Sequence, residues 1–594
     1  MAERPRKRVR TSPPPSATSG VAAEPTARHE ESSDATSGIH GRANDDAGPL
    51  ARYSIPPTSH YASDRRSPTA FQQPLPLTSF SYSPRRELLT QPHERDASLS
   101  YYRDPQPGAD LNVGYEEAVW RDGTVDEGLD ALLESLDVWA GEHDTASNGN
   151  PVQGPSSSAA RDLLAKTGLI TWRGMLTKLM LAVYECENVA NGRRADGWEM
   201  NAMLVEDCLY LEESSPPAKL AAKSASERSG AGALPSYYGY SFESYCTTSD
   251  PSASHTTEAF QVPNTNVQWC SVVKTNLGGV RTIVGGEVDC VLPPLPGVSQ
   301  ERFAAAQRRT TDGYVELKTN MVIQSQRDEV NFERLKLLKH YVQSFLLGVP
   351  TVTIGFRTRQ GRLASLQSFK TLEIPKLVRG KPHGWDPAVC LASAHSLLAF
   401  IRQTILDHCA TRDRSEDDDG SEPEPVFRIA FSPAPSGSGI GASGPDQQQQ
   451  PPQQPAGVTV RLLSAREVEK EVVEGKRPVE GGRKGFLPSW WLGKARERAG
   501  RAAQQAAKAA STTEPTPGAS GQARHPQAGR QRPPPPPPPP ATLATGPTLG
   551  SESAAVSAPP TSDWTESRPR PSEGLPKSPT GAARLTGVAA TLKR

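Results

Sequence analysis

The chain has 594 residues, of which 35% are hydrophobic, 57 are proline and 49 are glycine, so a large part of it cannot bury a core. Its 66 basic and 66 acidic residues give a formal net charge of zero, which excludes a global positive field and leaves only local patches for nucleic-acid contact. No run of about 18 apolar residues and no close cysteine pair occurs, so we expect no membrane contact and no disulfide or zinc framework.

The first segment, residues 1–74, is rich in serine, proline, alanine and arginine and lacks apolar periodicity, which predicts a disordered tail. Within it, Arg4-Pro-Arg-Lys-Arg-Val-Arg10 forms a compact basic run. Such a run is typical of a nuclear localisation signal, although a solvated basic tail has the same composition. The start of the chain has no apolar segment of the kind that directs secretion, so we do not expect a secreted protein, and the basic run predicts a nuclear one.

Ordered patterns follow, and residues 75–497 are predicted to form one α+β domain. Apolar residues at helical spacing predict helices in residues 127–139, 172–185, 331–347 and 387–407. Alternating or β-branched segments predict strands in residues 198–211, 266–275, 281–292, 314–318, 351–356 and 458–463.

Two segments interrupt this domain and are predicted to be disordered insertions. Residues 218–234 are rich in alanine, serine and glycine, and residues 412–457 combine an acidic run with glutamine and proline repeats. Residues 498–594 form a second tail rich in proline, alanine and serine, in which the tract 533–540 favours polyproline II. The predicted architecture is therefore a single domain between disordered tails.

Charged residues stand inside two of the predicted strands. Glu287 and Asp289 lie two positions apart in a β-branched run, so strand alternation places both carboxylates on one face. Glu316 and Lys318 repeat this spacing in the next predicted strand. Because an unpaired charge in an apolar setting is strongly unfavourable, we expect these residues to neutralise one another or to bind a cation.

An acidic residue, a gap and then Glu-x-Lys is the arrangement that nucleases of the restriction-enzyme type use. A hard cation such as Mg²⁺ or Mn²⁺ prefers oxygen ligands, polarises a phosphate and lowers the pKa of a bound water. A neighbouring lysine orients the attacking water and offsets charge on the phosphoryl oxygens. Glu-x-Lys alone is weak evidence, and salt bridges on a strand surface are the alternative for these residues.

Three further residues extend the candidate site. Glu243 ends the segment Gly239-Tyr-Ser-Phe-Glu243, which we interpret as an aromatic strand, and is a candidate third acidic ligand. Arg173 stands at the start of a predicted helix, where its guanidinium can hold a phosphate through two hydrogen bonds. Gln343 lies on the long helix after Glu-x-Lys, where its amide can contact substrate or a metal-bound water. Taken singly, each also fits a structural role, as a strand end, a capping arginine or a solvated glutamine.

Short motifs around these residues follow one another along the chain. They are Thr171-Trp-Arg-Gly174, Trp198-Glu-Met-Asn201, Gly239-Tyr-Ser-Phe-Glu243, Gly286-Glu-Val-Asp289, Glu316-Leu-Lys318, Tyr341-Val-Gln-Ser-Phe-Leu-Leu-Gly348 and Gly355-Phe-Arg357. In this order they resemble the DXO/RAI family of RNA decapping and 5′-end quality-control hydrolases, and in particular its fungal nuclear members. The resemblance covers residues 75–430, with weaker similarity at residues 486–491.

The resemblance implies an α+β fold of two packed mixed β-sheets surrounded by helices, with the site in a pocket between the sheets. It also implies which residues act there. These are Glu243, Asp289, Glu316 and the Leu317 carbonyl for Mg²⁺ or Mn²⁺; Glu287, Lys318 and Gln343 for catalysis; and Arg173, Glu243 and Gln343 for the RNA 5′ end.

The resemblance further implies metal-dependent hydrolysis at RNA 5′ ends, with removal of pyrophosphate from a triphosphate, of an incompletely methylated cap or of an NAD cap. The expected partner is a nuclear 5′→3′ exoribonuclease, which such members bind and stimulate. A non-catalytic protein that stabilises this exoribonuclease is the alternative, and a DNA nuclease is a third hypothesis. We expect Asp289→Ala or Glu316→Ala to abolish turnover and to change folding little, because each removes buried repulsion as well as a metal ligand.

Overall fold

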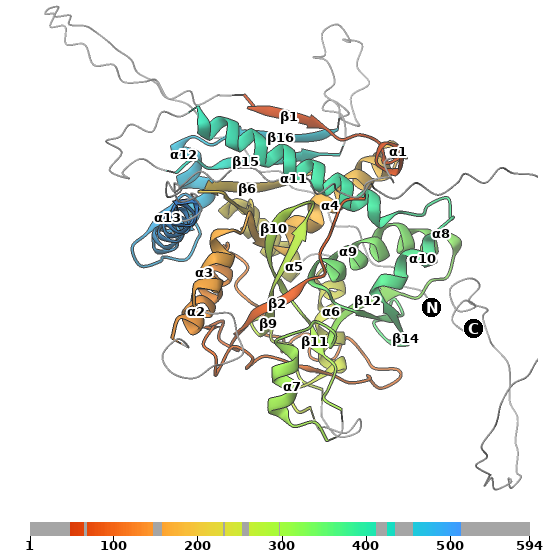
Figure 1. Cartoon of the computed structure of the whole chain (residues 1–594). Helices are drawn as coiled ribbons and strands as arrows, with labels where there is room; N and C mark the ends of the chain where they lie inside the picture. Colours follow the sequence, from red (N-terminus) through yellow and green to blue (C-terminus); the bar gives the residue numbers. More distant parts are fainter. Residues whose placement is uncertain are drawn as a thin grey trace, which may run out of the picture. The chain divides into compact units, whose positions relative to one another are not determined.

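The computed structural model describes residues 48–63, 68–145, 157–229, 232–251, 260–295, 297–411, 424–433 and 456–511. The basic run at residues 4–10, the proline tract at residues 533–540 and most of both predicted tails lie outside these ranges. Figure 1 shows the helices and strands of the described part, which form two large β-sheets with helices packed against them.

The larger sheet has ten strands and mixes parallel with antiparallel pairs. Its strand β5 is parallel to both of its neighbours, β7 and β10, and the remaining pairs are antiparallel. In spatial order the strands are β1 (Ala51–Ser54), β16 (Gly457–Leu462), β15 (Phe427–Ser432), β6 (Trp198–Val205), β7 (Cys208–Glu213), β5 (Leu169–Trp172), β10 (Val280–Glu287), β9 (Gln268–Leu277), β2 (Leu75–Tyr82) and β3 (Leu88–Leu89).

The smaller sheet has six strands; β4 and β11 are parallel, and so are β12 and β13, in which Glu316 lies beside Val352. Parallel neighbours need a crossover connection. One helical segment provides it between β12 and β13, as α8 (Gln326–Asn331), a π-helical turn (Phe332–Leu337) and α9 (Leu338–Leu347). In spatial order the strands are β14 (Leu363–Lys370), β13 (Thr351–Arg357), β12 (Tyr314–Met321), β11 (Cys290–Val291), β4 (Tyr101–Tyr102) and β8 (Thr247–Thr248).

The chain passes from one sheet to the other between β10 and β11. β10 ends at Glu287 in the larger sheet and β11 begins at Cys290 in the smaller one, so two residues make the connection. The preceding β9–β10 hairpin turns at Gly278 and Gly279, whose φ angles of +57° and +94° favour glycine. The crossing segment is thus held by ladders of hydrogen bonds on both sides.

The other described elements are mostly helical. They are α1 (Thr58–Ser63), α2 (Asp130–Thr145), α3 (Ser157–Ala165), α4 (Arg173–Ala190), α5 (Pro217–Ser229), α6 (Ala233–Cys246), α7 (Gln300–Gln307), a 3-10 turn (Thr371–Glu373), α10 (Ile374–Val378), α11 (Pro387–Ala410), α12 (Ala465–Glu467), a second π-helical turn (Val468–Val473) and α13 (Ser489–Ser511), together with a hairpin of β17 (Arg483–Lys484) and β18 (Leu487–Pro488).

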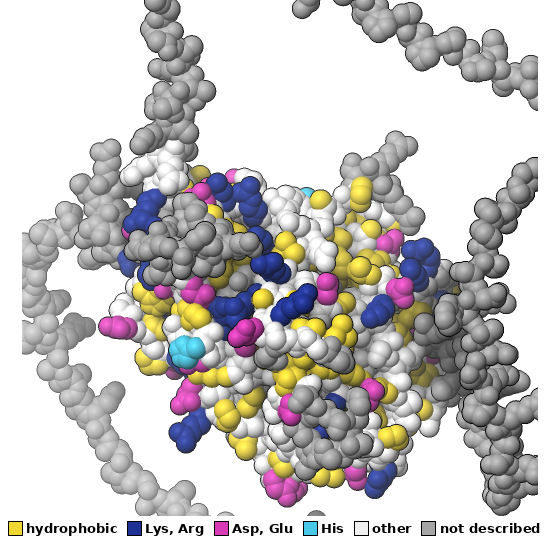
Figure 2. All heavy atoms as spheres, turned by 60° about the horizontal axis from the view of Figure 1, so that its bottom comes forward, with side chains coloured by type: hydrophobic (Ala, Val, Ile, Leu, Met, Phe, Trp, Pro, Cys, Tyr) yellow, Lys and Arg dark blue, Asp and Glu magenta, His cyan; other side chains and the backbone are white. Residues whose placement is uncertain are grey.

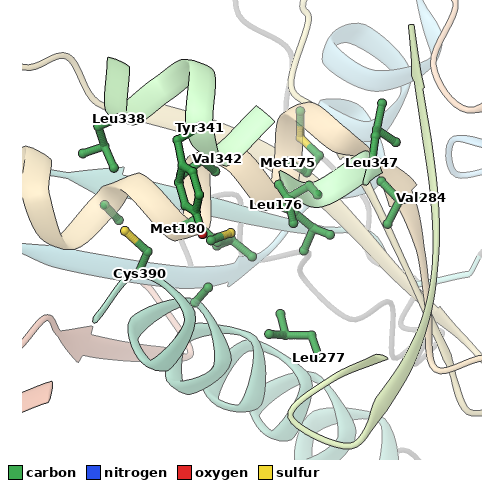
Figure 3. Packing of buried hydrophobic residues seen from close by; sticks show 14 of the residues in the cluster. Met175, Leu176, Met180, Leu277, Val284, Leu338, Tyr341, Val342, Leu347 and Cys390 are labelled. Atoms are coloured by element: carbon green, nitrogen blue, oxygen red, sulfur yellow. The ribbon is translucent and has the colours of Figure 1, made fainter. Parts of the chain in front are cut away.

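The main hydrophobic core lies where α9 and α11 pack on α4. Figure 3 shows Met180 of α4 beside Tyr341 of α9, with Cys390 of α11 nearby. The same view shows Leu347, at the end of α9, beside Val284 of β10. Burial of such side chains contributes about 25 cal/mol per Å² of apolar surface, so this packing holds the end of α9 firmly against the larger sheet.

Helix α11 is long and apolar enough to cross a membrane, judged by length and composition alone. A core helix meets the same criterion, and α11 has a buried face that includes Leu397 and Ile401 and packs on α4. It also lies along β16, as Figure 1 shows. The expected lack of membrane contact stays a prediction.

Charged side chains gather locally on the surface. Figure 2 shows lysine and arginine side chains (dark blue) in separate groups, with acidic and apolar side chains between them. This distribution agrees with the zero formal net charge. An anionic ligand must therefore be bound by a local group of cations rather than by a uniform field.

The ordered part of the chain begins earlier and ends later than predicted. β1 and α1 lie within residues 1–74, the predicted tail, and β1 pairs with β16 through Tyr53 and Val458. α13 continues beyond residue 497 to Ser511. Both elements adjoin low-complexity sequence, and β1 is only four residues long, too short for a recognisable pattern.

The two predicted insertions also contain regular structure. Most of residues 218–234 belongs to α5 and to the start of α6, because its alanines and lysines favour a helix as well as a linker. Phe427–Ser432, inside the predicted insertion 412–457, is the strand β15, and its Phe427 and Ile429 are fully buried. Residues 412–423 and 434–455 lie outside the described residues.

Candidate active site

Two acidic residues lie where the chain passes between the sheets. Glu287 is the last residue of β10, and Asp289 directly precedes β11. β11 pairs with β12 through Cys290 and Val315, which brings Asp289 close to the middle of β12. There the backbone N–H of Leu317 donates a hydrogen bond of 2.6 Å to Asp289 Oδ2. The predicted acidic residue and the Glu-x-Lys strand are therefore in contact.

Glu316 is a fully buried carboxylate between two cations. Lys318 Nζ lies 2.8 Å from Glu316 Oε1 and 3.2 Å from Asp289 Oδ2. It also donates a hydrogen bond of 2.9 Å to the carbonyl oxygen of Leu317. On the other side, Arg173 Nη1 donates a hydrogen bond of 3.0 Å to Glu316 Oε2. Glu316 itself is 0% exposed, so its charge is balanced entirely by protein groups.

Arg173 reaches this point because α4 begins directly after β5. Trp172 lies beside Gly285 in the parallel pair of β5 and β10, so the first residue of the helix emerges next to the end of β10. A Cβ atom on Gly286 would lie 3.2 Å from Arg173 Cβ and 2.5 Å from Leu347 Cδ1. The glycine is therefore needed for the close approach of both helices to β10, and Arg173 stands at a helix start as predicted.

Glu243 belongs to a helix, and the interpretation of Gly239–Glu243 as a strand is wrong. α6 covers this segment and packs on β12. Its buried positions include Tyr238, Phe242 and Cys246, which recur every four residues, as one face of a helix requires. The aromatic residues suggested a strand because they favour strands, and this preference hid the helical spacing.

The carboxylates of the site differ in how readily they ionise. Burial, and then the negative charge of Asp289, raise the pKa of Glu243 well above its ordinary value and that of Glu287 to about 6. Burial is also the main reason for the raised pKa of Asp289. For Glu316, burial alone would raise the pKa, but the two cations that it contacts lower it to about 2. Repulsion among Glu243, Glu287 and Asp289 adds to the rise in the pKa values of Glu243 and Glu287.

This group of residues supplies the oxygen donors that a hard divalent cation binds. Glu316 Oε1 is buried and accepts no well-directed hydrogen bond, although it touches Lys318 Nζ. Among the residues described, no three His, Cys, Asp or Glu side chains stand close enough together to hold a metal ion. Lys318 forms ion pairs with Asp289 and Glu316 and donates a hydrogen bond to the Leu317 carbonyl oxygen. The donor set therefore fits a divalent cation in its chemistry, provided that the cation displaces Lys318.

Gln343 lies on α9, which approaches the site from the crossover between β12 and β13. Leu347, four residues later and thus on the same helix face, packs where a Cβ of Gly286 would lie. Gln343 is half-buried on this face, one turn back from the end of β10. Its predicted place beside the carboxylates is consistent with this geometry, and its role in contacting substrate stays a prediction.

Residues 72–441 match the family model described as RAI1 like PD-(D/E)XK nuclease. The chain belongs to this family. The decapping nuclease RAI1 of Mycosarcoma maydis is 34% identical over 500 residues, which are 73% of this chain and 89% of that protein.

Two solved structures have a similar fold. Rai1 of Scheffersomyces stipitis, in complex with 3′-NADP⁺ and a calcium ion, is 21% identical with a TM-score of 0.52, over 76% of this chain and 99% of that one. Rai1 of Candida albicans, in complex with pU5 and Mn²⁺, is 19% identical with a TM-score of 0.50, over 75% of this chain and 100% of that one. At these identities the likeness shows the fold alone.

Family membership confirms the predicted family and, with the structural likeness, the fold of two packed mixed sheets surrounded by helices. It also confirms the prediction of an enzyme of the decapping nuclease type. The assignment of individual residues to metal, substrate and catalysis stays a prediction.

His340 lies next to this site and was not predicted from the sequence. It lies on α9, three residues before Gln343. Both ring nitrogens are buried, and neither has a hydrogen-bond partner among the described residues. Burial, and then the positive charge of Lys318, lower the pKa of His340 to about 3, so the ring is neutral. A single histidine on a helix carries no spacing signal. The one feature of the sequence that could have indicated His340 is its position one turn before Gln343.

Proposed function

We propose that this protein hydrolyses phosphate bonds at RNA 5′ ends with the help of a divalent cation. The observation that carries the proposal is the convergence of carboxylates from β10, the β10–β11 connection, β12 and α6 on Lys318 and Arg173. Membership of a nuclease family supports the chemistry, and the name of the Mycosarcoma maydis relative supports decapping as the reaction.

Mg²⁺ or Mn²⁺, when bound, would supply a Lewis acid for the phosphate and lower the pKa of a water molecule. Glu243, Asp289, Glu316 and the Leu317 carbonyl are the proposed ligands, because all are hard oxygen donors that converge beside β12. Burial, together with repulsion from neighbouring carboxylates, raises the pKa values of Glu243 and Asp289, and a bound cation would compensate their negative charge.

The other residues of the site have complementary roles. Arg173 offers a planar guanidinium that can hold a 5′-terminal phosphate through two hydrogen bonds. Lys318 offsets negative charge that develops on the phosphoryl oxygens. The carboxylate of Glu287, with a pKa raised to about 6, is suited to accept a proton from the attacking water near neutral pH. The amide of Gln343 can orient that water or the phosphate.

The proposed substrates are RNAs with a 5′ triphosphate, an incompletely methylated cap or an NAD cap. All three present a phosphate chain at the 5′ end, which suits a site where the cationic side chains of Lys318 and Arg173 lie beside several carboxylates. Of the ligands of the two structurally similar proteins, 3′-NADP⁺ contains the nicotinamide dinucleotide of an NAD cap, and pU5 is a short RNA with a 5′ phosphate. The proposed catalytic unit is residues 48–511, which replaces the boundaries 75–497 expected from the sequence.

The test uses the full chain with each of the three RNAs and with duplex DNA, in Mg²⁺, in Mn²⁺ and in EDTA. We expect metal-dependent release of pyrophosphate, cap or nicotinamide nucleotide from RNA, and no cleavage of DNA. Asp289→Asn should be inactive. Asp312→Asn, an exposed position just before β12, should behave as the unmodified protein. Folded protein that yields no metal-dependent product from any RNA would refute the proposal, and cleavage of duplex DNA would favour the DNA nuclease.

A nuclear 5′→3′ exoribonuclease is the proposed partner, and the nucleus the proposed location. Support comes from the resemblance to fungal nuclear members and from the basic run at residues 4–10. Stimulation of the exoribonuclease that persists in the Asp289→Ala, Glu316→Ala double variant would show a partner role separate from catalysis. A cytoplasmic distribution of the full chain, unchanged when the basic run is replaced by alanines, would contradict the assigned location.

A further inference from the structure

Lys318 contacts the oxygen atoms that are the proposed metal ligands. Its ammonium forms ion pairs with Asp289 and Glu316 and donates a hydrogen bond to the carbonyl oxygen of Leu317. It therefore contacts three of the proposed metal ligands at once. An ammonium and a divalent cation cannot share these oxygens at close range, because they repel each other. A buried ammonium also needs a new acceptor wherever it moves, since an unpaired buried charge is strongly unfavourable.

The register between the crossover helix and β12 shows what lies beside Lys318. The helix runs antiparallel to the strand, and Lys336 Nζ donates a hydrogen bond of 2.9 Å to Asn320 Oδ1 near the strand's end. From Lys336 to His340 is one helical turn, about 6 Å along the axis. From Asn320 back to Lys318 is two strand residues, about 7 Å and on the same face. His340 therefore lies beside Lys318.

Two observations agree with this placement. After burial, the positive charge of Lys318 is the largest influence on the lowered pKa of His340. The π-helical turn Phe332–Leu337 immediately precedes α9, and such turns are frequent at functional sites because they change which side chains face inward. The phase of α9 is thus set just before His340.

His340 has hydrogen-bonding capacity that no contact among the described residues uses. A neutral imidazole carries one N–H donor and one bare nitrogen acceptor. Both nitrogens of His340 are buried without a partner within the described part of the chain, which is rare for buried polar atoms. An unused acceptor thus lies next to a lysine that must move when a cation binds.

We propose that His340 is a positioning residue that receives the ammonium of Lys318 when a divalent cation occupies the carboxylates. In the metal-free state, Lys318 binds Asp289 and Glu316. In the loaded state, Lys318 Nζ donates a hydrogen bond to the bare ring nitrogen of His340, which stabilises that state and keeps the ammonium near the phosphate. This inference rests on the proposed use of a metal ion, and it assigns His340 no contact with substrate.

The first measurement is Mn²⁺ binding to the full chain by calorimetry, without RNA. His340→Phe keeps an aromatic ring but removes the acceptor, and it should weaken Mn²⁺ binding about tenfold, as expected for one hydrogen bond to a charged group. His340→Gln keeps an acceptor and should bind Mn²⁺ nearly as the unmodified protein does. If His340→Phe does not fold, as judged by its melting temperature, His340→Met takes its place.

The second measurement compares Mn²⁺ binding with and without His340→Phe in proteins that also carry Lys318→Met, where no ammonium needs an acceptor. There His340→Phe should leave Mn²⁺ affinity unchanged. An equal loss in both backgrounds would assign the effect to packing and overturn the proposal, and so would unchanged affinity of His340→Phe when Lys318 is present. If Mn²⁺ does not bind the unmodified protein, both this inference and the metal-dependent function fail, which is a distinguishable result.

Discussion

Neutralising Glu316 and Glu287 one at a time should change the stability of the metal-free protein in opposite directions. Glu316 lies between Arg173 and Lys318, and these cations lower its pKa from 4.5 to about 2 in spite of burial. One pKa unit corresponds to about 1.4 kcal/mol, so the folded state favours the ionised form by about 3 kcal/mol. Because Glu316 is fully buried, solvent does not screen this term. Glu316→Gln should therefore destabilise the protein by about 3 kcal/mol at neutral pH.

The ionised form of Glu287 has the opposite effect on the stability of the fold. Burial, and then Asp289, raise its pKa from 4.5 to about 6, so its ionised form destabilises the fold by about 1–2 kcal/mol at neutral pH. Glu287→Gln should stabilise the protein by that amount. The pH dependence follows: the contribution of Glu316 is present above its unfolded pKa and is lost as the pH falls through about 2. The unfavourable contribution of Glu287 develops as the pH rises from 4.5 through about 6.

The assay is unfolding in urea, followed by tryptophan fluorescence in EDTA, with melting temperatures as a second measure because a chain of this size need not unfold in two states. Shifts of equal sign for the two variants would refute the reasoning. The expectation from sequence, that loss of Glu316 changes folding little, considered repulsion alone. The contacts with Arg173 and Lys318 reverse it.

Three further variants test separate parts of the structure. Gly286→Ala should lower the melting temperature and turnover together, because the new methyl group would lie 2.5 Å from Leu347 Cδ1; an unchanged melting temperature would show that α9 can shift. Burial raises the pKa of Glu185 to about 7, so Glu185→Gln should stabilise the protein by about 1–3 kcal/mol above that pH and not below 4.5, as urea titrations can show. Lys318→Met should bind Mn²⁺ more tightly in calorimetry and lose turnover, since the ammonium competes with the cation and offsets phosphoryl charge; weaker binding would contradict that competition.

The strand residues of the site could be predicted because charge inside an apolar strand is a strong local signal. Glu287, Asp289, Glu316 and Lys318 stand out by period and chemistry alone, and adjacent strands bring them together whatever surrounds them. Glu243 alone was a weak candidate that the order of the motifs strengthened, and its secondary structure was predicted wrongly. The helical spacing of its buried neighbours depends on contact with β12, which no local pattern contains.

His340 and the state of Lys318 could not be predicted, because both depend on tertiary register. The distance of a helix residue from a strand residue is set by where the crossover begins, by the π-helical turn and by the Lys336–Asn320 hydrogen bond. The strands β1 and β15 escaped prediction for a related reason. Each is short and adjoins low-complexity sequence, and each becomes a strand by pairing with β16.

Lys318 connects the stability of the site with its proposed chemistry. Its ammonium neutralises Glu316 and Asp289, which allows these carboxylates to be buried. The same contacts mean that a cation must compete with an intramolecular ammonium, and the apparent metal affinity is the intrinsic affinity reduced by that competition. A residue that stabilises the displaced ammonium raises this affinity without touching the metal. His340, with an unused buried acceptor one turn from Lys336, is placed to do this.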